Sequence, residues 1–458
     1  MNAVEKHTFN QELMSLAVPF ALQNLLHALV GATDALMLGR LNQESIAAVS
    51  LANQISFIMS LFTGAIIGAA GVLIAQYWGK RDYTGAKRFM SIAIRNVFFI
   101  TLVFFLLAFL IPEKLMFIFT KESELIEIGA EYLKIVSFSY VLAGVAQCYL
   151  MMMRVCGRQK LSVWIAAVTV IVDMVVDFFL IYGFGGIPAL GANGAAYSTI
   201  AVEVIALTWC LIDSYRKDHI HPDRESMFFF SKIFEVDILK IAASMLASSL
   251  SWGLSISVQS LIMGHLGTDA TAAASVTGVA LQLMQCVGHG LSGGAGIMIG
   301  RLLGQNFLDK AKQYGRQFWT VSTWCGILNV GILCVIGPLV LKFYVLEPLA
   351  KSYLVQMLIF SAFYMFAFSY NAIITCGVFP AGGDAKYDAI SVFFATWCFA
   401  LPLALLGCFV FRWPVMAVYI IMRLDEIVKV PFIYPRYKKY IWVKNLTREQ
   451  TAAVSAGL

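Results

Sequence analysis

Twelve long apolar runs, separated by short polar segments, constrain this chain more than any other feature of its sequence. An α-helix needs roughly 20 apolar residues to cross a hydrocarbon layer of about 30 Å, and each run is near that length. Lipid offers no hydrogen-bond partner to exposed backbone, so spanning segments must be helices or strands of a closed barrel. A barrel would need segments of about ten alternating residues, whereas these runs are unbroken. The sequence therefore predicts an all-α integral membrane protein with twelve transmembrane helices.

Charged residues, prolines and glycines mark the ends of the predicted spans. The spans cover residues 13–39, 46–76, 89–111, 128–153, 161–184, 192–213, 238–263, 271–300, 317–337, 352–376, 389–411 and 414–434. The composition agrees, since 60% of the residues are hydrophobic and only 13% are charged, against about 25% charged residues in soluble domains. This excludes a two-domain soluble protein. The nine cysteines lack metal-ligand spacing, so we interpret them as small apolar residues.

Lysine and arginine are distributed unequally over the two sides of the predicted membrane region. One side holds the N-terminus, the loop after every second span and the C-terminal tail, and 23 of the 33 basic residues lie there. Basic loops remain in the cytoplasm, so we expect a multi-pass protein of the cytoplasmic (inner) membrane with both termini cytoplasmic. The net charge of +6 forms no continuous patch, so we expect no nucleic-acid partner.

The sequence also contains an internal repeat. Residues 36–87 align with residues 261–312 without a gap, and 14 of the 52 positions are identical, mostly small residues that favour close helix packing in lipid. Six spans separate the copies, which predicts two six-helix bundles related by a pseudo-twofold axis, a parallel repeat. We predict an N-terminal lobe at 1–213, a cytoplasmic linker at 214–237 and a C-terminal lobe with a cytoplasmic tail at 238–458. Duplicated lobes usually rock around a central site, which favours a transporter over a channel.

Acidic residues inside the N-terminal spans are candidates for a functional site, because a charge within the membrane is costly. Counted from Leu41, Phe184 and Ala192, where the helices are expected to meet the outer surface, Asp34, Asp177 and Thr199 each lie seven residues in, about 10 Å deep. Asp173 and Glu203 lie eleven residues in, about 16 Å deep, and no lysine or arginine shares these depths in the same spans. Crowded carboxylates at low dielectric cannot all ionise. The cluster is expected either to exchange protons or to bind a monovalent cation such as Na⁺ through Asp34, Asp173, Asp177 and Thr199.

Other polar residues within the spans are candidates for a substrate cavity or a bend. The cavity residues we predict are Gln23, Asn24, Asn53, Gln259, Gln282 and Tyr370. Pro19 is expected to bend the first helix, because proline removes a backbone donor. The predicted spans between 238 and 411 contain no acidic residue. The last span carries four charged residues whose spacing allows pairing within the helix, namely Arg423, Asp425, Glu426 and Lys429.

Several stretches in combination resemble the multidrug and toxic compound extrusion (MATE) transporters. In the first half they are VPFALQNLLHALVGATDALMLGRL, SIAAVSLANQI, GVLIAQYWGKRDYTGAKR, RVCGRQKLSV, DMVVDFFLIYG and LGANGAAYST, and in the second half AGGDAKY and RYKKYIWVKNLT. The resemblance covers essentially the whole chain. It implies twelve helices in two bundles around a cleft, and export of small organic cations or drugs in exchange for H⁺ or Na⁺.

The resemblance also implies roles for individual residues. Asp34 takes the place of the family's helix 1 acid and Asp177 that of its helix 5 acid, while Thr199 matches the threonine beside the cation site. The chain departs from the family at Asp173, where asparagine is usual, and at Glu203, where a neutral polar residue is common. The C-terminal half lacks the acids of the Na⁺-driven NorM-like branch, so the chain is more similar to the DinF-like branch.

Motifs of soluble chemistry are absent from the sequence. It contains no Walker A loop, HExxH or GxSxG, so we expect neither an enzyme nor a cofactor beyond the coupling ion. We therefore predict a secondary active multidrug efflux transporter that works by alternating access, as a monomer in membrane lipid. A flippase for a lipid-linked or amphiphilic substrate is the alternative within transport. A channel and a membrane-embedded scaffold are alternatives from other classes.

Overall fold

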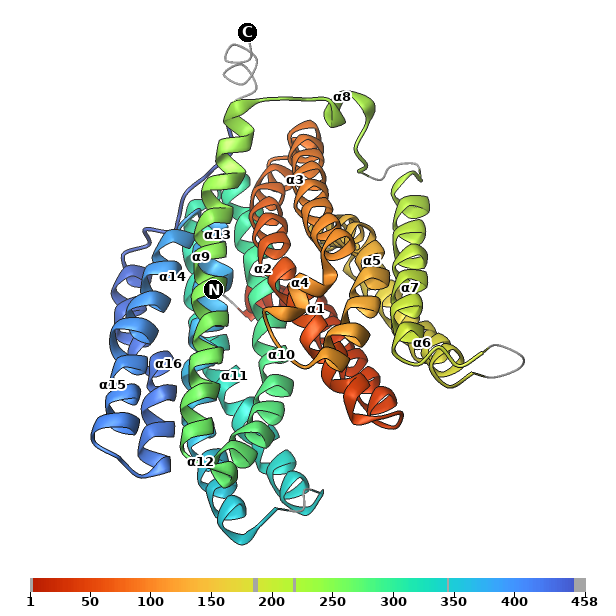
Figure 1. The fold of residues 1–458 in the computed structure, drawn as a ribbon. Coiled ribbons are helices and arrows are strands. Elements are labelled where there is room, and N and C mark those ends of the chain that lie inside the picture. The colour runs from red at the N-terminus through yellow and green to blue at the C-terminus, as the bar shows by residue number, and fades with distance from the viewer. Residues whose placement is uncertain (1–2, 184–187, 217–219, 344–345, 449–458) are drawn as a thin grey trace. The chain divides into compact units, whose positions relative to one another are not determined.

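The computed structural model describes residues 3–183, 188–216, 220–343 and 346–448. Within these ranges the chain is helical and contains no strand (Figure 1). The first half comprises α1 (Ala3–Gly39), α2 (Gln43–Gly79), α3 (Tyr83–Leu110), α4 (Pro112–Phe117), α5 (Ser123–Val155), α6 (Gln159–Tyr182), α7 (Ala192–Ser214) and α8 (Arg224–Met227).

The second half begins with three long helices, α9 (Lys232–His265), α10 (Thr268–Gly304) and α11 (Leu308–Phe343). Two longer segments follow, in which α-helix alternates with π-helix. They are α12 (Pro348–Asn371), η1 (Ala372–Val378) and α13 (Phe379–Ala381), then α14 (Ala385–Phe393), η2 (Phe394–Ala400), α15 (Leu401–Leu405) and η3 (Leu406–Val410). The last helix is α16 (Val415–Lys438).

The twelve predicted spans all lie on helical segments, apart from residues 111, 411 and 414, which are just beyond a helix end, and residue 184, which lies outside the described residues. Over the described ranges, ten helices are long and apolar enough to cross a membrane. The other two are α9, which contains seven serines, and α16, which carries the four charged residues of the last predicted span. The all-α multi-pass membrane fold is therefore confirmed.

The internal repeat extends to the helix boundaries. Helices α2 and α10 both have 37 residues, and α10 begins and ends 225 positions after α2. The turns that follow them contain Arg81 and Asn306, again 225 positions apart, with φ of 63° and 62°. Positive φ is uncommon for residues other than glycine. Its presence at equivalent positions means that the two copies share backbone conformation as well as small residues.

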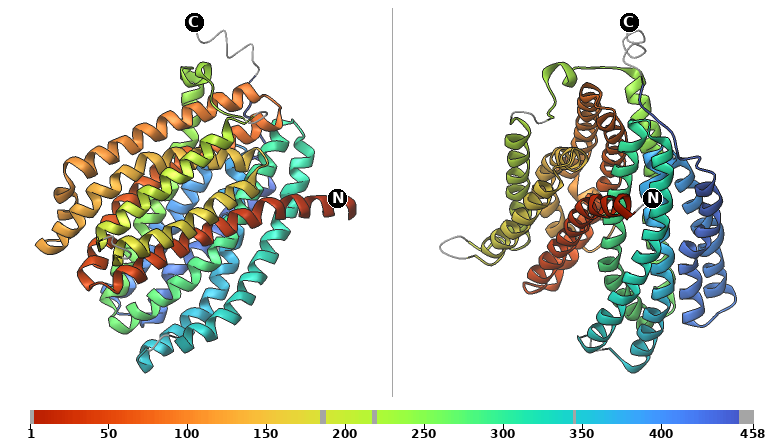
Figure 2. Two further views of the ribbon diagram at one scale, coloured as in Figure 1. Left: turned by 90° about the vertical axis from the view of Figure 1, so that its right-hand side faces the viewer. Right: turned by 180° about the vertical axis from the view of Figure 1, so that it is seen from behind.

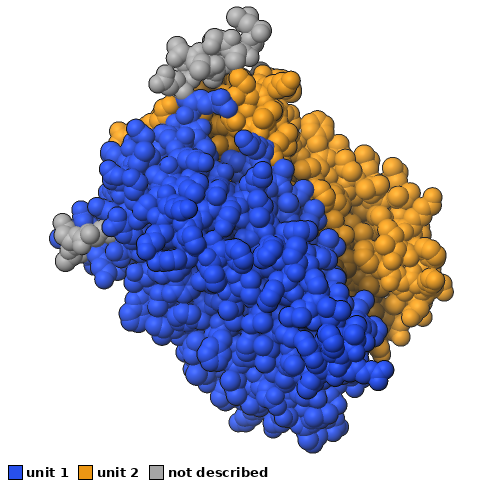
Figure 3. Space-filling model, turned by 90° about the vertical axis from the view of Figure 1, so that its left-hand side faces the viewer, with its two compact units in different colours: residues 1–21, 240–448 blue, residues 22–239, 449–458 orange. Residues whose placement is uncertain are grey.

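Two compact units divide the chain (Figure 3). Unit 1 contains the chain up to Ala21 together with Lys240–Arg448, and unit 2 contains Leu22–Leu239. Both boundaries lie within helices, one in α1 and one in α9. The predicted lobes at 1–213 and 238–458 therefore differ from the units chiefly in the first 21 residues, which pack with the C-terminal helices. Within each unit the long helices run alongside one another (Figure 2).

Glycines of α10 allow the first part of α1 to pack closely within unit 1. A Cβ atom at Gly290 would lie 2.6 Å from the Cβ of Ala21 and 2.7 Å from the carbonyl oxygen of Ala17. A Cβ at Gly293 would lie 3.0 Å from the ring of Phe20. A larger residue at Gly290 would collide with α1 and one at Gly293 would crowd Phe20, so these two glycines serve close helix packing.

The segment between α7 and α9 packs on α3 within unit 2. The Lys87 ammonium lies 3.2 Å from a carboxylate oxygen of Asp223, and the Ser91 hydroxyl lies 3.2 Å from that of Ser226. Arg95 donates to the carbonyl oxygen of Phe229 at 3.2 Å. Polar contacts along one face of α3 thus hold the described part of the predicted linker.

Candidate functional site

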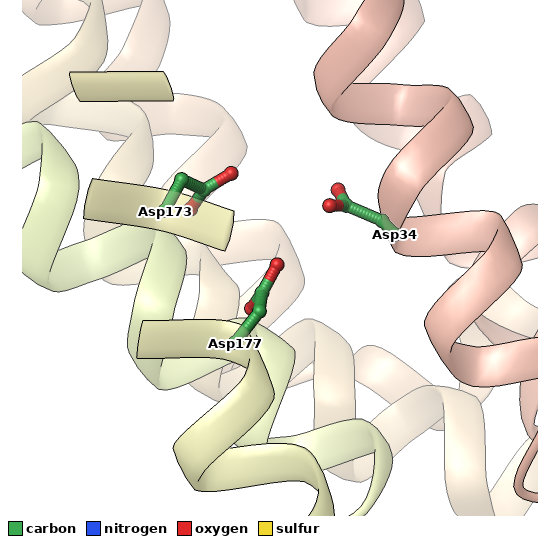
Figure 4. A group of neighbouring side chains, drawn as sticks. All are labelled: Asp34, Asp173 and Asp177. Atoms are coloured by element: carbon green, nitrogen blue, oxygen red, sulfur yellow. The ribbon is translucent and has the colours of Figure 1, made fainter. Parts of the chain in front are cut away.

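Three carboxylates of unit 2 converge at one point between α1 and α6. Asp173 and Asp177 project from successive turns of α6 towards Asp34 on α1 (Figure 4). One carboxylate oxygen of each residue lies within 4.8 Å of those of the other two. The i,i+4 spacing on α6 puts the two α6 acids on the same helix face. The structure therefore brings together three of the predicted site residues.

The surroundings of this acid cluster (Asp34, Asp173 and Asp177) are largely buried. Asp173 is 6% exposed and Asp177 is 2% exposed, while Asp34 is half-buried. The Asp177 Oδ1 atom is buried without a hydrogen-bond partner in the described part of the chain. No described lysine, arginine or histidine lies within ion-pair distance of the three carboxylates. The cluster is thus a concentration of negative charge without a neutralising side chain.

Helix α7 contributes a serine to the cluster that the sequence analysis did not identify. The Ser198 hydroxyl lies 3.2 Å from Asp173 Oδ1 and 3.3 Å from the Asp173 carbonyl oxygen. The neighbouring Thr199, which was predicted to be a ligand, donates instead to the carbonyl oxygen of Ala195 at 2.9 Å, one turn earlier in its own helix. Glu203 is half-buried on α7 and is not part of the three-acid group. In the sequence, the indication of this contact was that Ser198 directly precedes Thr199 in the stretch LGANGAAYST.

Clustered carboxylates of this kind have two chemical options. Three negative charges at such separations in a low-dielectric region repel one another strongly, so the cluster is more stable when it shares protons or holds a cation. Carboxylate and hydroxyl oxygens are suitable ligands for a hard cation. The geometry accommodates either a proton or a small cation.

Three residues of unit 2 that were predicted to line a substrate cavity, Gln23, Asn24 and Asn53, lie in different environments. Gln23 is buried, and its Oε1 accepts a hydrogen bond of 2.7 Å from Arg154 at the end of α5. Asn24 is half-buried on α1. Asn53 is exposed on α2, where its Oδ1 lies 3.4 Å from the Tyr132 hydroxyl. Pro19 lies within the continuous helix α1, two residues before the boundary between the units.

Unit 1 contains a cavity of about 460 Å³, formed by α9, α10, α12 and α16. Two of the predicted cavity residues, Gln259 and Gln282, line it together with Gln285. Tyr370 is not among its lining residues, because its hydroxyl contacts Thr323 at 2.7 Å and its ring packs on Trp319.

Charged side chains of α16 border this cavity. Arg423 and Asp425 both line it. The predicted pairing within the last span is confirmed for Lys429 and Glu426, whose Nζ and Oε1 atoms are 3.1 Å apart. It is wrong for Arg423 and Asp425, since neither has an ion-pair partner within the described ranges. At the predicted i,i+3 and i,i+4 spacings their partners were Glu426 and Lys429, but these two pair with each other and Arg423 packs on the rings of Tyr364 and Tyr419.

One acid of unit 1 was missed. Asp388 lies in the first turn of α14 and is 8% exposed, with the Ser248 hydroxyl donating to its Oδ2 at 2.5 Å. The expectation that helices in this part of the chain contain no interior acid is therefore wrong. The predicted span began at residue 389, whereas the helix begins four residues earlier.

Known proteins resemble this chain over most of its length. A sequence model of the MatE family matches residues 19–179 and 243–406, one segment in each half. The uncharacterized transporter YisQ of Bacillus subtilis is 24% identical over 94% of this chain and 95% of its own length. The probable multidrug resistance protein NorM of Agrobacterium fabrum is 25% identical over 85% of each chain.

Solved structures share the fold. A MOP superfamily transporter from Pyrococcus furiosus aligns with a TM-score of 0.85 at 16% identity, over 94% of this chain and 95% of the other. The matched family segments contain Asp34, Asp173 and Asp177 in the first half and Gln259 and Gln282 in the second. The chain therefore belongs to the MatE family, whose members are membrane transporters and not enzymes.

Proposed function

We propose that this protein is a secondary active exporter of lipophilic or cationic organic compounds, driven by antiport of H⁺ or Na⁺. The observation that carries the proposal is the acid cluster, where three carboxylates meet without a cationic side chain. The similarity to the Agrobacterium relative, a probable multidrug resistance protein, supports the substrate class. The predominance of basic residues on one side supports a cytoplasmic membrane location with both termini inside.

The position of Asp34 offers a route from ion binding to movement. Asp34 lies in the part of α1 that belongs to unit 2, whereas the same helix up to Ala21 belongs to unit 1. A proton or Na⁺ at the cluster reduces the repulsion between Asp34 and the two α6 acids. The part of α1 that carries Asp34 can then move closer to α6. Pro19, which lacks a backbone donor, is the weakest point between the two parts of the helix. We expect α1 to bend there and transmit the change to unit 1.

Alternating access follows from this arrangement. In the outward-facing state the cluster loads H⁺ or Na⁺ and substrate leaves. After the return to the inward-facing state the ion is released to the cytoplasm, and a new substrate molecule binds. A ligand shifts such an equilibrium only by its difference in affinity for the two states, so the coupling ion must bind the two states with unequal affinity.

Flux into everted membrane vesicles tests the proposal. With tetraphenylphosphonium as a lipophilic cation, a pH gradient and a Na⁺ gradient are imposed separately, and we expect one of them to drive uptake. Asp34→Asn and Asp177→Asn should reduce this driven uptake to background. Asp309→Asn is the matched control, because Asp309 is exposed and pairs with Lys312 on α11, away from the cluster. Full driven uptake by Asp34→Asn would contradict the proposal.

A further inference from the structure

The cavity of unit 1 combines features that a pocket for lipophilic cations does not need. Its volume of about 460 Å³ falls within the range of small-molecule sites, roughly 300–1,000 Å³. Three glutamine side chains, Gln259, Gln282 and Gln285, line it, so both amide donors and carbonyl acceptors face a guest. One guanidinium and one carboxylate, those of Arg423 and Asp425, line the same space.

The guanidinium of Arg423 is held by aromatic rings and not by an acid. Its Cζ atom lies 5.1 Å from the ring centroid of Tyr364 and 5.7 Å from that of Tyr419. Both tyrosines are buried and line the cavity. Cation–π contacts and a hydrogen bond to the Tyr419 side chain orient the group, whose five N–H donors exceed this one partner. Arg423 is therefore prepared to bind a carboxylate through paired hydrogen bonds.

The carboxylate of Asp425 likewise makes no ion pair within 4 Å in the described part of the chain, although Lys429 and Arg423 are close enough to attract it. Its Oδ1 accepts the backbone N–H of Glu426 at 2.8 Å, and its Oδ2 lies 3.5 Å from the Thr396 hydroxyl. The nearby ammonium of Lys429 pairs with Glu426. Each carboxylate oxygen can accept two hydrogen bonds, so Asp425 retains capacity for an ammonium group of a guest.

We propose that this cavity binds a zwitterionic molecule, with its carboxylate at Arg423 and its ammonium group at Asp425. A simple cation would face Arg423, and a simple anion would face Asp425, so each would meet a like charge. A guest that carries both charges satisfies both side chains, and the glutamine amides suit a peptide-like or amide-rich body. The inference rests on the proposed export function for its biological use, but binding itself does not require the acid cluster of unit 2.

Direct binding to the purified full-length protein in detergent tests the inference. The probes are four forms of one dipeptide: Phe–Phe, its N-acetyl form, its C-terminal amide, and the form blocked at both ends. They differ in charge but little in shape. Isothermal titration calorimetry should give Phe–Phe an affinity about tenfold or more above each blocked form, the size of one charge-assisted hydrogen bond. Equal affinity for all four forms would overturn the inference.

Three variants separate the two charges from a purely structural effect. Arg423→Gln should remove the preference for Phe–Phe over its amide, and Asp425→Asn should remove the preference over the N-acetyl form. Arg423→Lys should keep the first preference. Because each ratio is measured within one variant, a general loss of affinity does not imitate the result. Unchanged ratios in Arg423→Gln and Asp425→Asn would also overturn the inference.

Binding and flux distinguish this inference from the export proposal. If Phe–Phe binds as predicted but no ion gradient drives tetraphenylphosphonium uptake, the cavity assignment stands and the export proposal fails. If uptake is driven but the four dipeptide forms bind equally, the export proposal stands and the cavity assignment fails.

Discussion

The Ser198 hydroxyl lies 3.2 Å from Asp173 Oδ1 and joins α7 to the acid cluster of α1 and α6. Its neighbour Thr199 makes its hydrogen bond inside α7, to the carbonyl oxygen of Ala195. The two hydroxyls are adjacent in sequence but point about 100° apart around the helix. Only the first of them has a hydrogen bond to a member of the cluster.

Ser198→Ala should therefore alter ion coupling more than Thr199→Ala does. A hydrogen bond to a charged group is worth about 1.5–3 kcal/mol, so the half-saturating concentration of the coupling ion should change by about tenfold or more. It should fall if the ion is H⁺, because the lost donor stabilised the ionised carboxylate of Asp173, and rise if the ion is Na⁺, which competes with the proton for that carboxylate. Thr199→Ala removes a bond to its own helix backbone and should change this concentration little. The measurement is driven uptake in vesicles as a function of pH or Na⁺. A larger effect of Thr199→Ala would assign the ligand role to the threonine.

Gly290→Ala should destabilise unit 1, because the added methyl group would lie 2.6 Å from the Cβ of Ala21. Overpacking of this kind costs about 1–3 kcal/mol. Gly278→Ala in the same helix is the matched control, since nothing lies within 4 Å of its Cβ position. Thermal unfolding of the two variants without ligand should show a lower melting temperature only for Gly290→Ala. Equal melting temperatures would mean that α1 moves away at little cost.

Lys429→Met should lower stability by about 3–5 kcal/mol, because it leaves Glu426 charged and buried without its partner. Both residues are less than a tenth exposed. The double variant Lys429→Met with Glu426→Gln removes the uncompensated charge and should recover most of the loss. Melting temperatures of the two single variants and the double variant measure the coupling. Additive losses would indicate that the pair does not act as a unit.

Asp223→Ala should loosen the segment between α7 and α9 from α3. Backbone and hydroxyl hydrogen bonds from Ser226, and Lys87 nearby, lower the pKa of Asp223 to about 2. Because this value lies below the ordinary value of about 4, the contribution to stability is full at neutral pH and is lost as the pH falls from about 4 through about 2.

The loosening is measurable by amide hydrogen exchange of residues 220–231. The effect should be below about 1 kcal/mol, because the Lys87–Asp223 ion pair is partly exposed. Asp223→Asn keeps an oxygen acceptor for the Ser226 N–H and should have the smaller effect. Over roughly pH 5–8 the native segment should show no titration of this contact. A strong pH dependence there would place the anchor elsewhere.

The sequence alone was sufficient for the spans and the repeat, because both depend on periodic features of one chain. Hydrophobic length predicts a spanning helix without knowledge of its neighbours. The shift of 225 residues, found from identities, also relates Arg81 to Asn306, whose backbone conformations agree. Counting the helical rise likewise placed Asp34 and Asp177 near one level, and their carboxylates do meet.

Depth along a helix does not determine direction around it, and this limits the prediction of the site. Thr199 has the predicted depth, but Ser198 bonds to Asp173. Span ends are a second limit, since a boundary that was four residues late concealed Asp388. A third limit is that spacing within one helix does not show which neighbouring helices offer a better partner. Arg423 packs on tyrosines of α12 and α16 and not on an acid of its own helix.

The boundaries of the two units, inside α1 and α9, mean that unit 2 is an insertion within unit 1 and that the sequence halves are not folding halves. A cut in the segment between α7 and α9 would leave the first 21 residues on the fragment that lacks their packing partners. Separately expressed halves should be unstable alone and recover their fold only when they assemble with each other.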